Sequence, residues 1–190
     1  METIMARGPN FIYAKEFIQE EYGEEIWDKL LRSLPDDVSK IWKRPILVTT
    51  VYPFSVFKML TKELSNQVGT MDNQETALLY EHIADRSLST VYKVFFRFTN
   101  PAFVIRNYPK LWKRFFTTGT VEVPLAESNH AMLRFVLPEI FLDWLSPACY
   151  GYSKKAVEMA GGKALKVEKK AQTRLQNGLW EIFYELFWEK

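Results

Sequence analysis

Apolar side chains recur at helical spacing through the first two-thirds of the chain, and this pattern predicts a succession of helices. A first helix begins at Pro9 and Asn10 and ends near Gly23, because proline favours the first turn of a helix and glycine favours its end. A second helix follows within the stretch EEYGEEIWDKLL. Its apolar stripe consists of Ile26, Trp27, Leu30, Leu31 and Leu34. The glycine therefore marks the corner of a predicted helix hairpin.

Three further segments are predicted before residue 70. We expect a short helix over 35–42, an extended segment over 45–51 and a helix that begins at Pro53 and is closed by Gly69. The side chains of this last helix that face inward are Phe54, Phe57, Leu60, Leu64 and Val68.

The next helix begins at Asp72, which resembles a capping box with Glu75 three residues later. Ser87 and Ser89 are expected to interrupt it before a segment over 91–98. Two short helices then begin at prolines, each after a plausible boundary residue, and a glycine ends the second of them. The residues concerned are Pro101, Pro109 and Gly119.

The pattern changes to strands after residue 119. The segments 120–125 and 131–137 have the pattern of two strands joined by a polar turn. The segment 138–160 is expected to form a helix that ends at two glycines. The dipeptide Asn177-Gly178 then indicates a β-hairpin with a two-residue type I′ turn. The last third of the chain is therefore predicted as a ββαββ unit with an antiparallel sheet.

The charges on either side of this turn predict a register for the hairpin. A two-residue loop places Gln176 opposite Leu179, and three pairs of opposite charge then face each other across the strands. These pairs are Arg174–Glu181, Lys170–Glu185 and Lys166–Glu189. The alternate side chains of the last strand, Trp180, Ile182, Tyr184, Leu186 and Trp188, are all apolar and are expected to face a helical layer.

Together these elements predict an α+β fold in one domain of 190 residues, in which a helical part (about 1–118) packs on a sheet part (about 119–190). The composition, 47% hydrophobic and 25% charged, is that of a globular protein. Aromatic residues make up 15% of the chain, and such side chains either fill a core or line an apolar cavity.

The net charge and the cysteine content indicate which kind of binding partner and which cellular compartment to expect. The net charge of +2 does not call for a polyanionic partner, so we expect no nucleic acid. A single cysteine, Cys149, excludes an internal disulfide and fits a reducing compartment. No apolar run reaches roughly 18 residues and the N-terminus has no apolar signal segment, so neither a membrane span nor export is expected. We expect a cytoplasmic protein.

Catalytic and metal-binding patterns are sparse. His82 and His130 have no second His or Cys at metal-ligand spacing, which argues against a metal site. Cys149 has no basic neighbour in the sequence and is interpreted as a small buried residue. No phosphate-binding glycine loop or nucleophile elbow is present. A non-enzymatic role is therefore favoured. An enzymatic role stays an alternative, because catalytic residues can come together from distant positions in the sequence.

Two basic clusters remain, over 108–116 and 163–174. We interpret them as solvated faces, because the predicted hairpin pairs three charges of the second cluster with glutamates. Exposed contacts to a partner protein are expected at the basic residues of the first cluster and at two phenylalanines on the charged side of the last strand. These residues are Lys110, Lys113, Arg114, Phe183 and Phe187.

Gly8, read together with the segment YGEEIW at 22–27, resembles the start of the haem nitric oxide/oxygen-binding (H-NOX) family. The closing segment EIFYELFW is similar to the last hairpin of the 4-vinyl-reductase-type domains of the same superfamily, which also includes small subunits of a Golgi tethering complex. The cysteines usual in that hairpin are absent here. The segments YPFSVFKML and NPAFVIRNYPKLWKRFFTTG resemble a myxobacterial-type paralogous family of unknown function.

The resemblance implies an H-NOX-like fold, yet the residues that would hold haem are missing. In the H-NOX family a proximal histidine and a Tyr-x-Ser-x-Arg motif bind the iron and the propionates. Here Trp112 stands where the histidine is expected, and the strand reads FVLPE at 135–139. We therefore expect no cofactor and no metal, with unconventional haem binding through His82 left open. The predicted ligand pocket consists of Phe103, Tyr108, Trp112, Phe135 and Leu137.

The resulting expectation is a non-enzymatic sensor or adaptor that binds a small apolar ligand, of lipid or fatty-acyl type, and signals to a protein partner. A homodimer is possible. One alternative is a purely structural interaction module whose pocket is filled by its own side chains. A haem-based gas sensor is the less favoured third interpretation.

Overall fold

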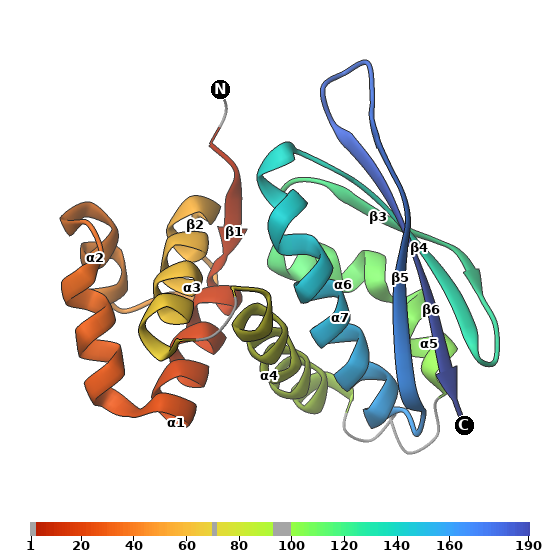
Figure 1. Cartoon of the computed structure of the whole chain (residues 1–190), viewed down its shortest axis with the longest axis horizontal. Coiled ribbons are helices and arrows are strands. Elements are labelled where there is room, and N and C mark those ends of the chain that lie inside the picture. Colours follow the sequence, from red (N-terminus) through yellow and green to blue (C-terminus); the bar gives the residue numbers. More distant parts are fainter. Residues whose placement is uncertain (1–2, 70–71, 93–99) are drawn as a thin grey trace.

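The computed structural model describes residues 3–69, 72–92 and 100–190 of the chain. Its N-terminal part consists of four helices and a small two-stranded sheet (Figure 1). The elements are β1 (Met5–Arg7), α1 (Gly8–Ser33), α2 (Asp36–Lys43), β2 (Val51–Pro53), α3 (Phe54–Val68) and α4 (Asp72–Tyr92). β1 and β2 pair in antiparallel fashion, so the start of the chain is joined to the residues that precede α3.

The predicted corner at Gly23 is confirmed. Gly23 has φ 80° and ψ 171° within α1, so the helix breaks there into two arms. Only glycine adopts this backbone region readily, because a Cβ atom would meet the neighbouring backbone. The second arm buries Trp27, whose ring contacts Trp42 of α2 with centroids 5.8 Å apart. The Ser39 hydroxyl of α2 donates to the Leu31 carbonyl at 2.7 Å and fixes the two helices together.

Two local expectations in this part are wrong. Most of 45–51 forms a loop, and the strand covers only Val51–Pro53. Ser87 and Ser89 do not end α4, which continues to Tyr92. Ser87 is buried inside the helix because its hydroxyl bonds to the Ala84 carbonyl and to Tyr152. The side chain of Asp72 and most of 91–98 lie outside the described residues.

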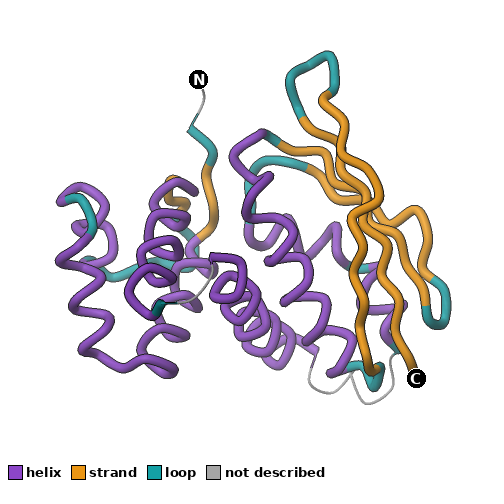
Figure 2. Tube along the Cα trace, in the orientation of Figure 1, coloured by secondary structure: helices purple, strands orange, loops and turns teal. Residues whose placement is uncertain are grey.

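The C-terminal part confirms the predicted ββαββ unit, preceded by two short helices. The elements are α5 (Pro101–Arg106), α6 (Tyr108–Phe115), β3 (Thr120–Ala126), β4 (His130–Leu137), a short 3-10 helix (Glu139–Phe141), α7 (Leu142–Met159), β5 (Lys163–Arg174) and β6 (Trp180–Glu189). The four strands form one antiparallel sheet in the order β3-β4-β6-β5. In Figure 2, α7 lies between α4 and the strands.

The hairpin forms at the predicted place with a different turn and register. Gly178 has φ 82°, but Asn177 does not have a positive φ, so the turn is not type I′. The amide of Gly178 donates to the Leu175 carbonyl, and that of Leu175 to the Leu179 carbonyl, which makes a three-residue loop. The register is consequently shifted by one residue at the turn, where Thr173 faces Glu181.

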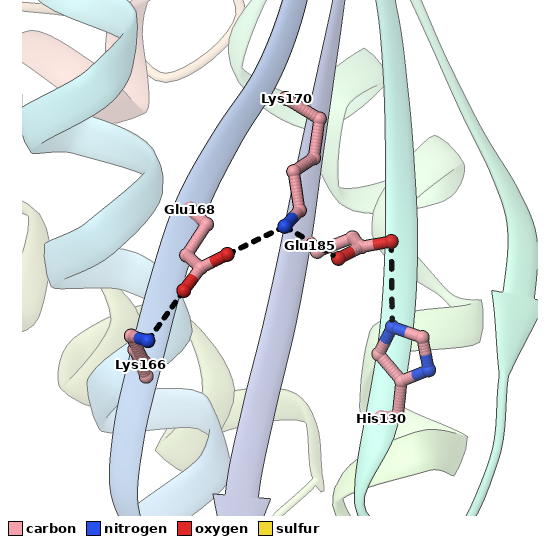
Figure 3. Close-up of polar contacts among 5 residues, drawn as sticks. All are labelled: His130, Lys166, Glu168, Lys170 and Glu185. Atoms are coloured by element: carbon pink, nitrogen blue, oxygen red, sulfur yellow. Dashed lines mark hydrogen bonds and ion pairs between the residues drawn. The ribbon is translucent and has the colours of Figure 1, made fainter.

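Of the three predicted charge pairs, only Lys170–Glu185 is found, at 3.1 Å, because the strand bulges between Lys169 and Ala171. Figure 3 shows the chain of charges that replaces the predicted ladder on the outer face of the sheet. Glu168 lies between two lysines, bonding Lys170 at 2.6 Å and also Lys166. The predicted apolar face of β6 is confirmed on the opposite side: Ile182, Tyr184, Leu186 and Trp188 are buried.

The helical part is joined to the sheet part through close packing of α4 on α7. A Cβ atom on Gly151 of α7 would lie only 2.0 Å from the Ala77 carbonyl oxygen of α4, so glycine permits this helix contact. Two ion pairs flank it, Lys154–Glu81 at 2.9 Å and Lys155–Asp85 at 3.1 Å. None of the helices in the described ranges is both long and apolar enough to cross a membrane.

Candidate functional site

A small internal cavity lies between the helices and the inner face of the sheet. Its volume is about 50 Å³, and α4, α6, β4 and α7 all contribute to its wall. The described side chains that line it are Tyr80, Tyr108, Leu111, Trp112, Phe115, Phe116, Phe135, Trp144, Leu145, Ala148, Cys149 and Tyr152. This is space for one or two water-sized molecules, since water occupies about 30 Å³ in the liquid. A molecule that fits into the cavity in this conformation would therefore have only a few atoms.

The aromatic rings around Trp112 close most of the remaining space. Trp112 packs against Phe116 with ring centroids 4.4 Å apart, against Phe135 at 5.7 Å and against Trp144 at 6.4 Å. Tilted and edge-to-face arrangements of this kind are favourable aromatic contacts. Trp112 differs from the other residues of the wall in being partly exposed. It is therefore the wall residue that also contacts solvent.

Hydroxyl and thiol groups of the wall are engaged with protein partners. The Tyr108 hydroxyl lies 2.5 Å from the Ser153 hydroxyl, and the Cys149 Sγ lies 4.0 Å from the same serine oxygen. The Tyr80 hydroxyl donates to the side-chain oxygen of Asn10 at 3.2 Å. Because these groups already have partners, the cavity presents a largely apolar surface to any ligand.

Burial also keeps the acidic groups of the wall neutral. Removal from water raises the pKa of the Cys149 thiol to about 12. The same cause raises the pKa values of the Tyr108 and Tyr80 hydroxyls well above their ordinary range. Neutral thiol and phenol groups are weak nucleophiles and weak metal ligands. The chemistry that this wall supports is therefore apolar binding.

The structure brings together three of the five predicted pocket residues. Tyr108, Trp112 and Phe135 line the cavity. Leu137 is buried on β4 beside Gly119, outside the lining. Phe103 is 45% exposed on α5 and also lies outside the lining. Its amide receives a cap from the Asn100 side chain at 2.9 Å, which places it in the first turn of that helix.

The wall residues on α7 were missed by the sequence analysis. Trp144, Ala148 and Tyr152 lie four residues apart, and Leu145 and Cys149 form a parallel row. This spacing places one stripe of the helix toward the cavity. The stripe was detectable in the sequence, but without the packing of α7 it indicates only a core-facing helix.

The five predicted partner-contact residues fall on separate surfaces. Lys113 and Arg114 of α6 line a groove beside β1 and α1, and Lys110 is exposed on the same helix. Phe183 and Phe187 lie half-buried on β6, where Phe187 stacks on His130 with centroids 4.5 Å apart. These residues therefore do not form one continuous contact.

The residues around the cavity do not fit a haem of the H-NOX kind. His82 packs against Phe17 and lines a different surface groove, while His130 lies on the outer face of the sheet. No lysine or arginine is among the described lining residues, so no cation is placed to hold propionates. Over 3–69, 72–92 and 100–190, no three His, Cys, Asp or Glu side chains are grouped to hold a metal ion.

Comparison with solved structures identifies the fold. The chain is similar to a Cs H-NOX variant with 4-cyano-L-phenylalanine at site 5, with a TM-score of 0.75 and 12% identity over 97% of each chain. It is also similar to the unliganded Fe(II) H-NOX protein from K. algicida, with a TM-score of 0.72 and 13% identity over 97% of each chain. A variant of the H-NOX protein from T. Tengcongensis gives a TM-score of 0.71 and 12% identity over 94% of each chain.

No family model and no curated protein matches the chain. The likeness nevertheless extends along almost the whole chain, from the helical part through the antiparallel sheet. It confirms the fold implied by Gly8 and the segment at 22–27. The chain therefore has the α+β fold of H-NOX domains.

Proposed function

We propose that this chain is a non-enzymatic sensor or adaptor module that binds a small apolar ligand in the cavity between α6, α7 and the sheet. The observation that carries the proposal is an apolar wall in the interior of an H-NOX-type fold, with the hydroxyls of Tyr80 and Tyr108 already bonded to protein. Such a wall offers contact area without competing hydrogen bonds, which favours apolar ligands over polar ones. Among the described lining residues, the Trp144 indole nitrogen is an exception, because it is a buried donor without a protein partner.

The proposed ligand is of lipid or fatty-acyl type, and its binding would enlarge the cavity. At about 50 Å³ the present cavity does not hold an acyl chain. Trp112 is partly exposed and its indole nitrogen donates to the Thr118 carbonyl at 3.1 Å, so an outward swing would break one hydrogen bond. Ligand entry would then displace α6 relative to β4, and a protein partner could read that displacement.

We propose further that the module works without haem and in the cytoplasm. The cavity's lack of a described histidine or cation supports the first point. The single, buried Cys149 supports the second. Haem binding through His82 is the opposing interpretation, and an absorbance spectrum after haem addition tests it: a Soret band that is lost in a His82→Ala variant would replace our proposal with a haem sensor.

Native mass spectrometry of the protein purified from cells tests the ligand directly. We expect an additional organic mass on the wild-type chain. Ala148→Val adds two methyl groups to the cavity wall and should remove that mass. The matched control is Ala171→Val, the same change on an exposed residue of β5, and it should retain the mass. Wild-type protein without any additional mass would contradict the proposal.

The second candidate function is a structural interaction module, favoured by the small size of the cavity. In that case the aromatic cluster around Trp112 is simply a core. Ala148→Val would then fill an empty space and raise the thermal stability of the chain, with no bound mass in either protein. The two functions therefore give opposite results in the same pair of measurements.

A further inference from the structure

A basic groove lies on the surface, separate from the internal cavity. It has a volume of about 450 Å³ and lies between β1, the start of α1, α6 and the loop that precedes β2. Its lining consists of Arg7, Pro9, Ile12, Tyr13, Val48, Lys113 and Arg114. The groove thus combines an apolar floor with three cations. This composition suits a ligand that carries both negative charge and apolar surface.

The three cations of the groove are not neutralised by the protein. Among the described residues, Arg7, Lys113 and Arg114 form no ion pair, and no aspartate or glutamate contributes to the lining. Arg7 instead donates from its Nε to the Lys113 carbonyl at 3.1 Å, which holds its guanidinium beside α6. Like charges held together without counter-charges attract an anionic partner.

The loop beside the groove exposes two adjacent aliphatic side chains. Leu47 is 57% exposed and Val48 is 64% exposed. The loop and the groove share Val48, so the two aliphatic side chains lie beside the three cations of the groove. We call this surface the loop face (Arg7, Leu47, Val48, Lys113 and Arg114).

This exposure is built into the fold. The Gly8 amide donates to the Thr50 carbonyl at 2.8 Å, and the Tyr52 hydroxyl accepts from the Leu47 amide at 3.0 Å. A Cβ atom on Gly8 would lie 2.0 Å from the Leu47 carbonyl oxygen, so the loop backbone packs directly on this glycine. The loop is therefore held in place while its aliphatic side chains remain in water, at a cost that an apolar partner would relieve.

We propose that the loop face docks on the surface of an anionic lipid bilayer. Leu47 and Val48 enter the headgroup region, while the three cations of the groove contact lipid phosphates and carboxylates. Leu47 lies outside the groove lining, so a peptide or a soluble anion confined to the groove would leave it in water. A bilayer surface contacts the groove rim and the loop together. This inference does not depend on a ligand in the internal cavity.

Vesicle co-sedimentation of the whole chain tests the proposal. We expect binding to vesicles of phosphatidylcholine with phosphatidylserine, and weak binding to phosphatidylcholine alone. Lys113→Gln/Arg114→Gln should weaken binding roughly five-fold for each cation removed, and added salt should weaken it further. Leu47→Ser/Val48→Ser should reduce binding at constant salt. All variants should retain the wild-type thermal unfolding temperature within a few degrees, because these side chains are on the surface.

Matched controls lie elsewhere on the surface. Leu78→Ser changes another exposed aliphatic residue, and Lys163→Gln/Lys169→Gln removes two exposed cations from β5; both should bind like wild type. Equal binding to both kinds of vesicle, or equal loss in the controls, would overturn the proposal. So would abolition of binding by millimolar inorganic phosphate, which indicates a soluble-anion site. Binding to a Glu-rich peptide without vesicle binding would assign the face to a protein partner instead.

Discussion

The Trp112 indole on α6 packs edge-to-face against the Phe135 ring on β4, with centroids 5.7 Å apart and planes inclined by 70°. This contact closes the cavity on the side where the wall is partly exposed. The buried Cys149 thiol belongs to the wall of the same cavity. Removal of the indole should therefore open a route from solvent to the thiol.

Trp112→Ala separates a movable wall from a filled core. Truncation of a fully buried tryptophan costs roughly 3–5 kcal/mol. Because Trp112 is partly exposed, we expect a smaller loss in the free energy of unfolding, measured by urea denaturation. Cys149 should react with iodoacetamide faster in this variant than in wild type. Trp180→Ala, at a partly exposed tryptophan outside the cavity, is the control and should leave the labelling rate unchanged. Unchanged labelling in Trp112→Ala would mean that the indole does not gate the cavity.

Cys149 predicts a characteristic pH dependence. Burial raises the pKa of the folded thiol to about 12 from its ordinary value of 9.0. The neutral thiol therefore contributes stability that is complete below pH 9 and is lost as the pH rises toward 12, because the unfolded chain ionises first. Labelling of the folded chain should remain slow through about pH 10, and the unfolded chain should react at an ordinary rate. Cys149→Ala should lose stability less steeply above pH 9; an identical slope would contradict the assignment.

Gly23→Ala should destabilise the chain although its surroundings are open. Apart from its chain neighbours and its own helix backbone, no atom lies within 4 Å of the position that a Cβ would take, so the cost comes from the backbone at φ 80° and ψ 171°. Strain of this kind costs about 1–3 kcal/mol. Equilibrium urea unfolding measures it. Glu25→Ala, two residues along on an exposed helix position, should change stability by no more than about half a kcal/mol. Equal effects of the two substitutions would refute the strain argument.

Glu168 should titrate well below an ordinary glutamate. Hydrogen bonds from Lys166 and Lys170 hold the pKa of its carboxyl at about 2 (Figure 3). Its lowered pKa means that the interaction is complete above the ordinary value of 4.5 and is lost as the pH falls toward 2. Carboxyl NMR of the folded chain measures the pKa directly. A Glu168 pKa near 4.5 would show that solvent screens both lysines.

Several features of the fold could be predicted from local chemistry. The corner at Gly23 and the apolar face of β6 depend on one residue type or on a short periodicity, and both are confirmed. The hairpin register was not predictable in this way. Asn177-Gly178 is compatible with two turn types, and the choice between them depends on how β6 pairs with β4 and on the bulge after Lys169.

The candidate site was only partly predictable for the same reason. Tyr108 and Trp112 were predicted as pocket residues because they lie on a short helix that the resemblance to the H-NOX family singled out. Phe135 was predicted because it lies on the strand that comes next in that comparison. Their partners on α4 and α7 are distant in the sequence. Phe103 lies on the exposed face of α5, and the sequence of so short a helix does not show which of its faces is buried.

By itself, the sequence determined most of the helices and strands and the antiparallel ββαββ order, because periodicity, glycine and proline act within a few residues. Only the tertiary structure decided the size of the cavity and which cations share a face. Both depend on contacts between distant segments, such as Gly8 against Leu47 and Gly151 against Ala77, where a missing Cβ lets two backbones meet. A local pattern shows that a glycine is present; only packing shows what it allows to come close.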